Sequence, residues 1–203
     1  MFIDDDSMYS WGSGKYGQLG HGARFDERYP KRVEMEQHVL QTCGPPVSIS
    51  AGDRHTCCIT SKALPSYPHP RPHLHLHLHL RLYTHCAPII SMPISKMTFV
   101  ERLKILSFGG GEHGQLGHGN GDDVMSPKII EALSSSRCVQ VSCGATNTAA
   151  TTESGMVYVW GFGENLHPKD QPNIFYEPRL VRFKEKVKQV ACGQSHIILL
   201  SGK

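Results

Sequence analysis

Short apolar stretches, separated by glycine and polar residues, run through most of the 203-residue chain. Residues 47–52, 139–144 and 187–193 each contain β-branched residues and end in a small residue followed by glycine. A turn and a second apolar stretch come after each of them. No helical period extends over a useful length, so the pattern predicts short antiparallel strands joined by glycine turns.

These strands belong to a repeat with three segments in constant order: an aromatic residue with a glycine-rich turn, a proline followed by a basic residue, and the strand ending in glycine. The glycine-rich segments are residues 11–22, 108–119 and, in a shorter form, 160–165, and the proline segments are residues 30–33, 127–130 and 178–181. Glycines at these spacings supply positive φ at tight turns. Units of about 50 residues, each a small antiparallel sheet, are typical of β-propeller blades.

The three ordered segments resemble the repeat of the regulator of chromosome condensation family. The resemblance implies a seven-bladed β-propeller. We therefore predict an all-β chain, a partial propeller of about three four-stranded antiparallel blades. The propeller repeats span residues 8–62, 104–154 and 155–203, the third truncated before the next blade. Since three repeats do not make a complete ring, we interpret the chain as a fragment, a truncated isoform or an imperfect gene model, with self-association through exposed blade edges as the alternative.

Residues 63–103 do not fit the repeat. They are rich in proline and contain a run in which histidine alternates with leucine. We predict a disordered low-complexity insert. An extended run would place four histidines on one face, so metal binding is a competing interpretation, which we rank lower because no cysteine or carboxylate accompanies them. The candidate ligands are His73, His75, His77 and His79. We otherwise predict no metal and no cofactor.

Loops are where propellers vary their contacts. One candidate loop follows the second glycine-rich turn. Another lies in the third repeat, where Leu166 and Lys169 replace glycines of the other copies and require a different turn. The candidate partner-contact residues are Asp122, Asp123, His167, Lys169, Asp170 and Asn173.

Charge and cysteine content bear on the kind of partner and on the cellular compartment. The formal net charge of +3 is not concentrated in a tail, so we predict no nucleic-acid partner. Cys143 and Cys192 align with Ala51, a pattern that indicates a small buried residue and not a ligand or a disulfide. The chain also lacks a signal peptide and any run of about 20 apolar residues. We expect a cytoplasmic or nuclear protein that is neither secreted nor membrane-bound.

The histidines do not indicate catalysis. His55 and His196 occupy the same repeat position, with Asn147 between them, as structural hydrogen-bonding residues do. No nucleophile, zinc-protease or phosphate-loop motif is present, so we predict a protein that is not an enzyme. The expected function is a non-catalytic protein–protein interaction or scaffold module. The alternative that the resemblance implies is guanine-nucleotide exchange on a small Ran-type GTPase, which would then be the protein partner.

Overall fold

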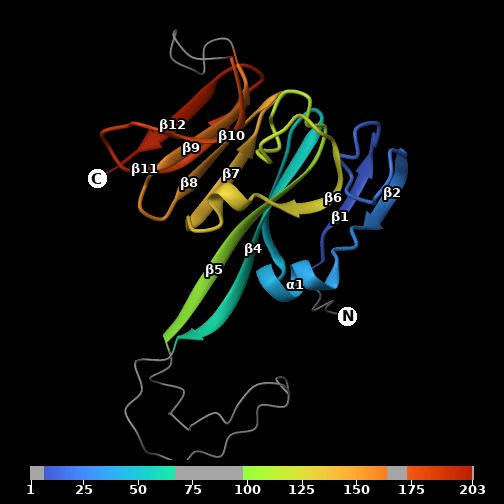
Figure 1. Cartoon of the computed structure of the whole chain (residues 1–203), viewed down its shortest axis with the longest axis horizontal. Coiled ribbons are helices and arrows are strands. Elements are labelled where there is room, and N and C mark those ends of the chain that lie inside the picture. The colour runs from blue at the N-terminus through green and yellow to red at the C-terminus, as the bar shows by residue number, and fades with distance from the viewer. Residues whose placement is uncertain (1–6, 67–97, 164–172, 203) are drawn as a thin grey trace, which may run out of the picture. The chain divides into compact units, whose positions relative to one another are not determined.

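The computed structural model describes residues 7–66, 98–163 and 173–202, drawn in colour in Figure 1. The chain divides into two compact units, one formed by Met1–Lys62 with Arg102–Lys203 and the other by Ala63–Glu101. The hydrophobic clusters described below lie in the first unit.

The described strands form two four-stranded antiparallel sheets and two two-stranded sheets. The first four-stranded sheet has the order β3 (Pro46–Ala51), β4 (His55–Ser66), β5 (Thr98–Gly109) and β6 (Val124–Ile129). The second has the order β7 (Cys138–Cys143), β8 (Asn147–Thr152), β9 (Val157–Phe162) and β10 (Ile174–Val181). The two-stranded sheets pair β1 (Tyr9–Gly12) with β2 (Glu27–Arg32) and β11 (Val187–Cys192) with β12 (Ile197–Ser201). The predicted fold class is confirmed.

The sheets do not coincide with the sequence repeats, although we predicted one four-stranded sheet for each repeat. Each four-stranded sheet takes its first two strands from one repeat and its last two from the next, so the assignment of one complete sheet to each repeat is wrong. The reason lies in the connections. Between β8 and β9 the chain turns tightly at Gly155, whose φ is +84° and whose N–H donates to Thr152 O at 2.9 Å. Strands joined by so short a turn pair with each other, and this turn crosses a repeat boundary.

Two short helical segments interrupt the strands in the part of the chain that the structure describes. The helix α1 (Gln37–Cys43) buries Val39 and Cys43, and the 3-10 helix η2 (Glu131–Leu133) buries Leu133. Neither was expected from the strand pattern. No helix among the described residues is long and apolar enough to cross a membrane.

The predicted insert is shorter at both ends than expected. Strand β4 continues to Ser66 and β5 begins at Thr98, so residues that we assigned to the insert belong to strands. The remainder, residues 67–97, lies outside the described residues, together with His73, His75, His77 and His79. The predictions for this segment stay predictions.

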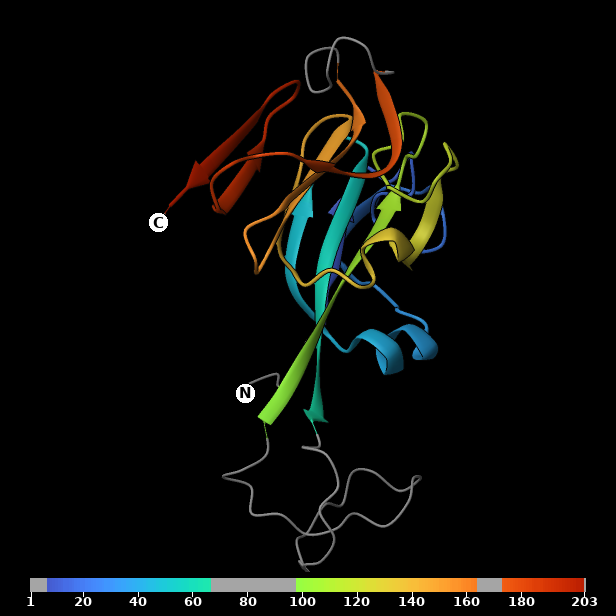
Figure 2. The same ribbon diagram turned by 60° about the vertical axis from the view of Figure 1, so that its left-hand side comes forward.

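Apolar clusters join each sheet to its neighbour in succession. Figure 2 shows the red β11–β12 pair beside the orange strands of the second four-stranded sheet. Strand β4 illustrates the two-residue period of a strand. Cys57 packs into the cluster shared with β7 and β9, whereas the adjacent Cys58 packs into the cluster shared with Met8 and α1. Both faces of the first four-stranded sheet are therefore core.

Glycine turns cover the aromatic residue of the next repeat. Gly117 has a φ of +76°, and a Cβ at this position would lie 2.9 Å from Trp160 Nε1. The indole N–H donates to Gln115 O at 2.8 Å, which satisfies it in a fully buried site. Gly20 approaches Phe108 in the same way. The turn glycines thus set the spacing between consecutive repeats.

Candidate functional site

The glycine-rich loops of the first two repeats are built alike. A serine donates from Oγ to a main-chain carbonyl in the loop, as Ser10 does to Leu19 O at 2.6 Å and Ser107 to Leu116 O at 2.7 Å. A histidine Nε2 lies 3.0 Å from the same hydroxyl, in His21 and in His118. These histidines brace loops, which agrees with a structural function.

Burial and the nearby Lys128 lower the pKa of His118 from 6.5 to about 4. The side chain is therefore neutral at physiological pH. Neutral imidazole can accept or donate one hydrogen bond at Nε2, which suits its contact with Ser107.

An aspartate closes each of these loops. Gly111 N–H donates to Asp123 Oδ1 at 2.9 Å, and Gly14 N–H donates to Asp26 Oδ1 at 2.9 Å. The other oxygen of Asp123 pairs with Arg24 at 2.6 Å. Asp123, a candidate contact residue, therefore has a structural function in its loop. Its alignment with Asp26 is the sequence signal that the repeat comparison missed.

The other candidate contact residues have different settings. Asp122 is exposed, and its Oδ2 accepts from Asn120 Nδ2 at 2.6 Å. Asn173 is exposed at the start of β10, and its carbonyl accepts from Gly163 N–H at 3.1 Å. The loop that carries Asp122 borders the same strand, because Gly119 N–H donates to Tyr176 O at 2.9 Å. His167, Lys169 and Asp170 lie outside the described residues.

Aromatic side chains are exposed on β1, on β2 and in the loop between them. Trp11 is 59% exposed, Phe25 74% and Tyr29 79%. Trp11 occupies the repeat position at which Phe108 and Trp160 are 1% and 0% exposed. The same repeat position is thus core in two copies and surface in the first. Exposed aromatic side chains are enriched at interaction surfaces.

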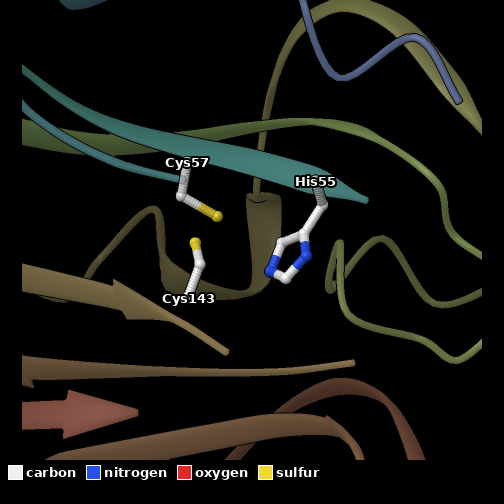
Figure 3. A group of neighbouring side chains, drawn as sticks. All are labelled: His55, Cys57 and Cys143. Carbon is white, nitrogen blue, oxygen red and sulfur yellow. The ribbon is translucent and has the colours of Figure 1, made fainter. Parts of the chain in front are cut away.

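A buried group of potential ligands lies between the two four-stranded sheets. His55 and Cys57 come from β4 and Cys143 from the end of β7, and one ligand atom from each lies within 4.8 Å of the others. Figure 3 shows the two sulfur atoms directed toward each other with the imidazole beside them. All three side chains are buried. Aligning the repeats did not bring these residues together, because it led us to interpret His55 and Cys143 as structural residues at two different repeat positions.

Hydrogen bonds hold this group. His55 Nε2 lies 2.8 Å from Thr148 Oγ1, which in turn donates to Gln115 O at 2.8 Å. His55 Nδ1 is buried and has no hydrogen-bond partner among the described residues. Cys143 N–H donates to Ser50 Oγ at 2.9 Å. The histidine ring is therefore held at one nitrogen only.

The two thiols differ in acidity. The contact with Cys143 and burial raise the pKa of Cys57 well above its usual value. Burial opposes ionisation of Cys143 as well, but the hydrogen bond with Cys57 and the proximity of His55 lower its pKa below the ordinary value. Of the two thiols, Cys143 therefore loses its proton more readily than Cys57.

Comparisons with known proteins agree with this architecture. The family model described as "Regulator of chromosome condensation (RCC1) repeat" matches residues 5–59, 104–151 and 154–200. The chain is 28% identical over 210 residues to the E3 ubiquitin-protein ligase HERC2 of Homo sapiens, covering 96% of this chain and 4% of HERC2. It is 29% identical over 220 residues to the Ultraviolet-B receptor UVR8 of Arabidopsis thaliana, covering 98% of this chain and 48% of UVR8.

A solved structure, Prp20p of Saccharomyces cerevisiae, shares the fold with a TM-score of 0.65 at 17% identity, covering 98% of this chain and 40% of Prp20p. The chain thus spans less than half of each of these relatives. The repeats matched by the family model make up most of the chain. The chain therefore belongs to the regulator of chromosome condensation (RCC1) repeat family.

Proposed function

We propose that this chain is a non-catalytic protein–protein interaction module that acts in the cytoplasm or nucleus. The observation that carries the proposal is the exposure of three large aromatic side chains, Trp11 on β1, Tyr29 on β2 and Phe25 in the loop between these strands. Burying one apolar side chain of this size is worth about 1.5–3 kcal/mol before the entropic and desolvation costs of association are subtracted. Large aromatic side chains are also the residues that most often dominate binding energy at interfaces.

The buried equivalent of Trp11 in the third repeat indicates which group Trp11 can contact in a partner. Trp160 is covered by the turn glycine Gly117 and donates its indole N–H to a main-chain carbonyl. Trp11 offers the same indole N–H on an exposed ring. A glycine-rich turn that presents a carbonyl would suit it. Such a turn is present in this family's own repeat, so a second copy of the chain is one partner that the chemistry supports.

The test measures association directly. Sedimentation equilibrium of the purified chain over a range of concentrations should show dimers or larger species. Trp11→Ala should weaken that association at least tenfold, and Tyr29→Ala should weaken it less. Phe183→Ala is the matched control, because Phe183 is exposed on another part of the chain. Equal effects of Trp11→Ala and Phe183→Ala would contradict an aromatic interface on β1–β2.

The second candidate function is guanine-nucleotide exchange on a small Ran-type GTPase. Family membership supports it, as does the similarity to Prp20p, which was studied for its binding to Gsp1p and histones. Exchange requires only that the protein bind the nucleotide-free GTPase better than the loaded form. The assay follows release of fluorescent GDP from the GTPase. Acceleration of about tenfold, or about 1.4 kcal/mol of barrier, would make exchange the better assignment.

A further inference from the structure

We propose that His55, Cys57 and Cys143 bind a thiophilic closed-shell cation, Zn²⁺ or Cu⁺, between the two four-stranded sheets. The site is distinct from the exposed aromatic side chains and does not depend on the function proposed above. Two sulfur atoms and an imidazole converge there from β4 and β7 (Figure 3). Sulfur and imidazole ligands are those that select these cations.

The geometry suits a metal of this size. The three ligand atoms lie within 4.8 Å of one another. Bond lengths of about 2.3 Å to sulfur and about 2.0 Å to nitrogen place tetrahedral ligands about 3.5–3.8 Å apart, so shifts of about 1 Å in the side chains would close the site. His55 and Cys57 stand two apart on β4 and so project from the same face of the strand. Both are therefore aimed toward Cys143.

The second four-stranded sheet packs on β3–β6 at a first boundary and on the β11–β12 pair at a second boundary. The second boundary shows that packing between sheets does not require His55, Cys57 and Cys143. There Asn147, Ala149 and Cys192 occupy the repeat positions of His55, Cys57 and Cys143. The two boundaries share the same bracing contact, because Cys192 N–H donates to Ser142 Oγ at 2.9 Å just as Cys143 N–H donates to Ser50 Oγ. One boundary thus forms with a single sulfur and no imidazole. The first boundary carries two additional ligands that packing alone does not explain.

The surroundings fit a cation electrostatically. Two thiolates and a neutral imidazole balance the charge of Zn²⁺, which makes burial of the ion tolerable. Cu⁺ would use the three soft ligands without a fourth. Oxygen atoms also lie beside the ligands, since Thr148 Oγ1 is 2.8 Å from His55 Nε2 and Ser50 O is 3.4 Å from Cys143 Sγ.

The imidazole presents Nε2 to the two sulfur atoms (Figure 3), and the same nitrogen lies 2.8 Å from Thr148 Oγ1. Ligation through Nε2 would displace that contact, whereas Thr148 Oγ1 would keep its hydrogen bond to Gln115 O.

The experiment uses the full chain, reduced and freed of metal with a chelator. One arm titrates Co²⁺, a spectroscopic substitute for Zn²⁺, and follows the thiolate-to-metal charge-transfer band, and then displaces Co²⁺ with Zn²⁺. The other arm measures competition with a chromophoric Cu⁺ chelator. We expect one equivalent of at least one ion to bind. Binding should also raise the thermal unfolding midpoint.

The variants take the residues that the chain itself carries at the equivalent positions of other repeats, so that folding is preserved. They are His55→Asn, Cys57→Ala and Cys143→Ala, and the corresponding residues elsewhere in the chain are Asn147, Ala149 and Ala51. Each removes one of three ligands, so each should weaken binding by more than the roughly 10–100-fold that loss of an outer-shell partner costs and should abolish the shift in unfolding midpoint. Cys192→Ala is the matched control at the second boundary and should leave both unchanged.

Three results would overturn the proposal. One is the absence of stoichiometric binding of either ion. Another is binding that persists in the Cys57→Ala/Cys143→Ala double variant. The third is binding that disappears when His73, His75, His77 and His79 are all changed to Ala, because the histidine run would then hold the ion. A Cys57–Cys143 disulfide on oxidation, without cation binding by the reduced protein, would replace the metal site with a redox pair.

Discussion

The two boundaries of the second four-stranded sheet share the same strand arrangement and hydrogen bonds but differ in the side chains of their cores. At the first boundary, with β3–β6, the core contains Trp160, Ile59 and Ile105, together with the His55–Cys57–Cys143 group. At the second boundary, with β11–β12, the core consists mainly of valines and an alanine. The repeat thus fixes the strands and their bracing hydrogen bonds, while the side chains between sheets vary without changing the fold.

The polar residue at the repeat position of His55 shows the same freedom. At the first boundary, His55 reaches the Thr148 hydroxyl of the next sheet. At the second, Asn147 donates from Nδ2 to Gln194 O at 3.0 Å. Either residue links neighbouring sheets with a hydrogen bond across the boundary. The comparison shows that histidine or asparagine can make the hydrogen bond between neighbouring sheets, and of these two residue types only histidine is a common metal ligand.

The largest expected effect is at the first boundary. Trp160→Ala should destabilise the chain by about 3–5 kcal/mol, because it leaves a cavity and removes the bond to Gln115 O. Val190→Ala, in the core of the second boundary, should cost about 1.5–3 kcal/mol. Urea unfolding monitored by circular dichroism measures both. Equal losses would contradict the difference between the boundaries.

The next effect concerns the glycine turn that covers Trp160. Gly117→Ala should destabilise by about 2–3 kcal/mol, because it combines a left-handed conformation with a close approach to the indole. Gly22→Ala is the control, since its φ is also +76° but its Cβ would meet nothing closer than Ser126 Oγ at 3.7 Å. We expect about 1–2 kcal/mol there. A Gly22→Ala loss as large as that of Gly117→Ala would show that backbone strain alone is responsible.

Acid should also act on the first four-stranded sheet, where His118 lies beside Ser107 of β5. The folded-state pKa is about 4 and the ordinary value 6.5, so the unfolded chain takes up the proton first as pH falls. The stability from neutral His118 is complete above about pH 6.5 and is lost as pH falls toward about 4. His118→Gln should flatten that part of the stability curve. An unchanged curve would assign the acid sensitivity to other groups.

The smallest effect tests the exchange of histidine for asparagine between the boundaries. In metal-free protein, His55→Asn should cost only about 0.5–1.5 kcal/mol, the usual net value of one hydrogen bond. Asn147→His should cost a similar amount if the two boundaries are interchangeable. Both are measured by urea midpoint. A loss above about 3 kcal/mol for His55→Asn would show that the first boundary needs the imidazole for packing as well.

The sequence predicted strands and turns well because both depend on local chemistry. Glycines with positive φ, such as Gly117 and Gly155, and β-branched residues act within a few positions of themselves. Strand partnership is less local. The repeat pattern did not indicate that β8 pairs with β9 across a repeat boundary, because the periodicity of side chains does not identify the neighbouring strand.

The candidate site was harder to predict for the same reason. Cys57 and Cys143 meet only because two sheets pack face to face, and their separation in the chain conceals this. The one available signal was that Cys57 stands where the second repeat has Ala149. The contact loops were partly accessible, since aligning Asp123 with Asp26 would have identified its function in closing the loop.

The offset between repeat and sheet has a consequence for how this chain responds to force or heat. A four-stranded sheet that contains strands of two repeats connects those repeats by main-chain hydrogen bonds. The second repeat cannot unfold without removing strands from both four-stranded sheets. Local unfolding of one repeat is therefore coupled to its neighbours, and repeats of this design should melt in concert, unlike arrays in which each repeat closes on itself.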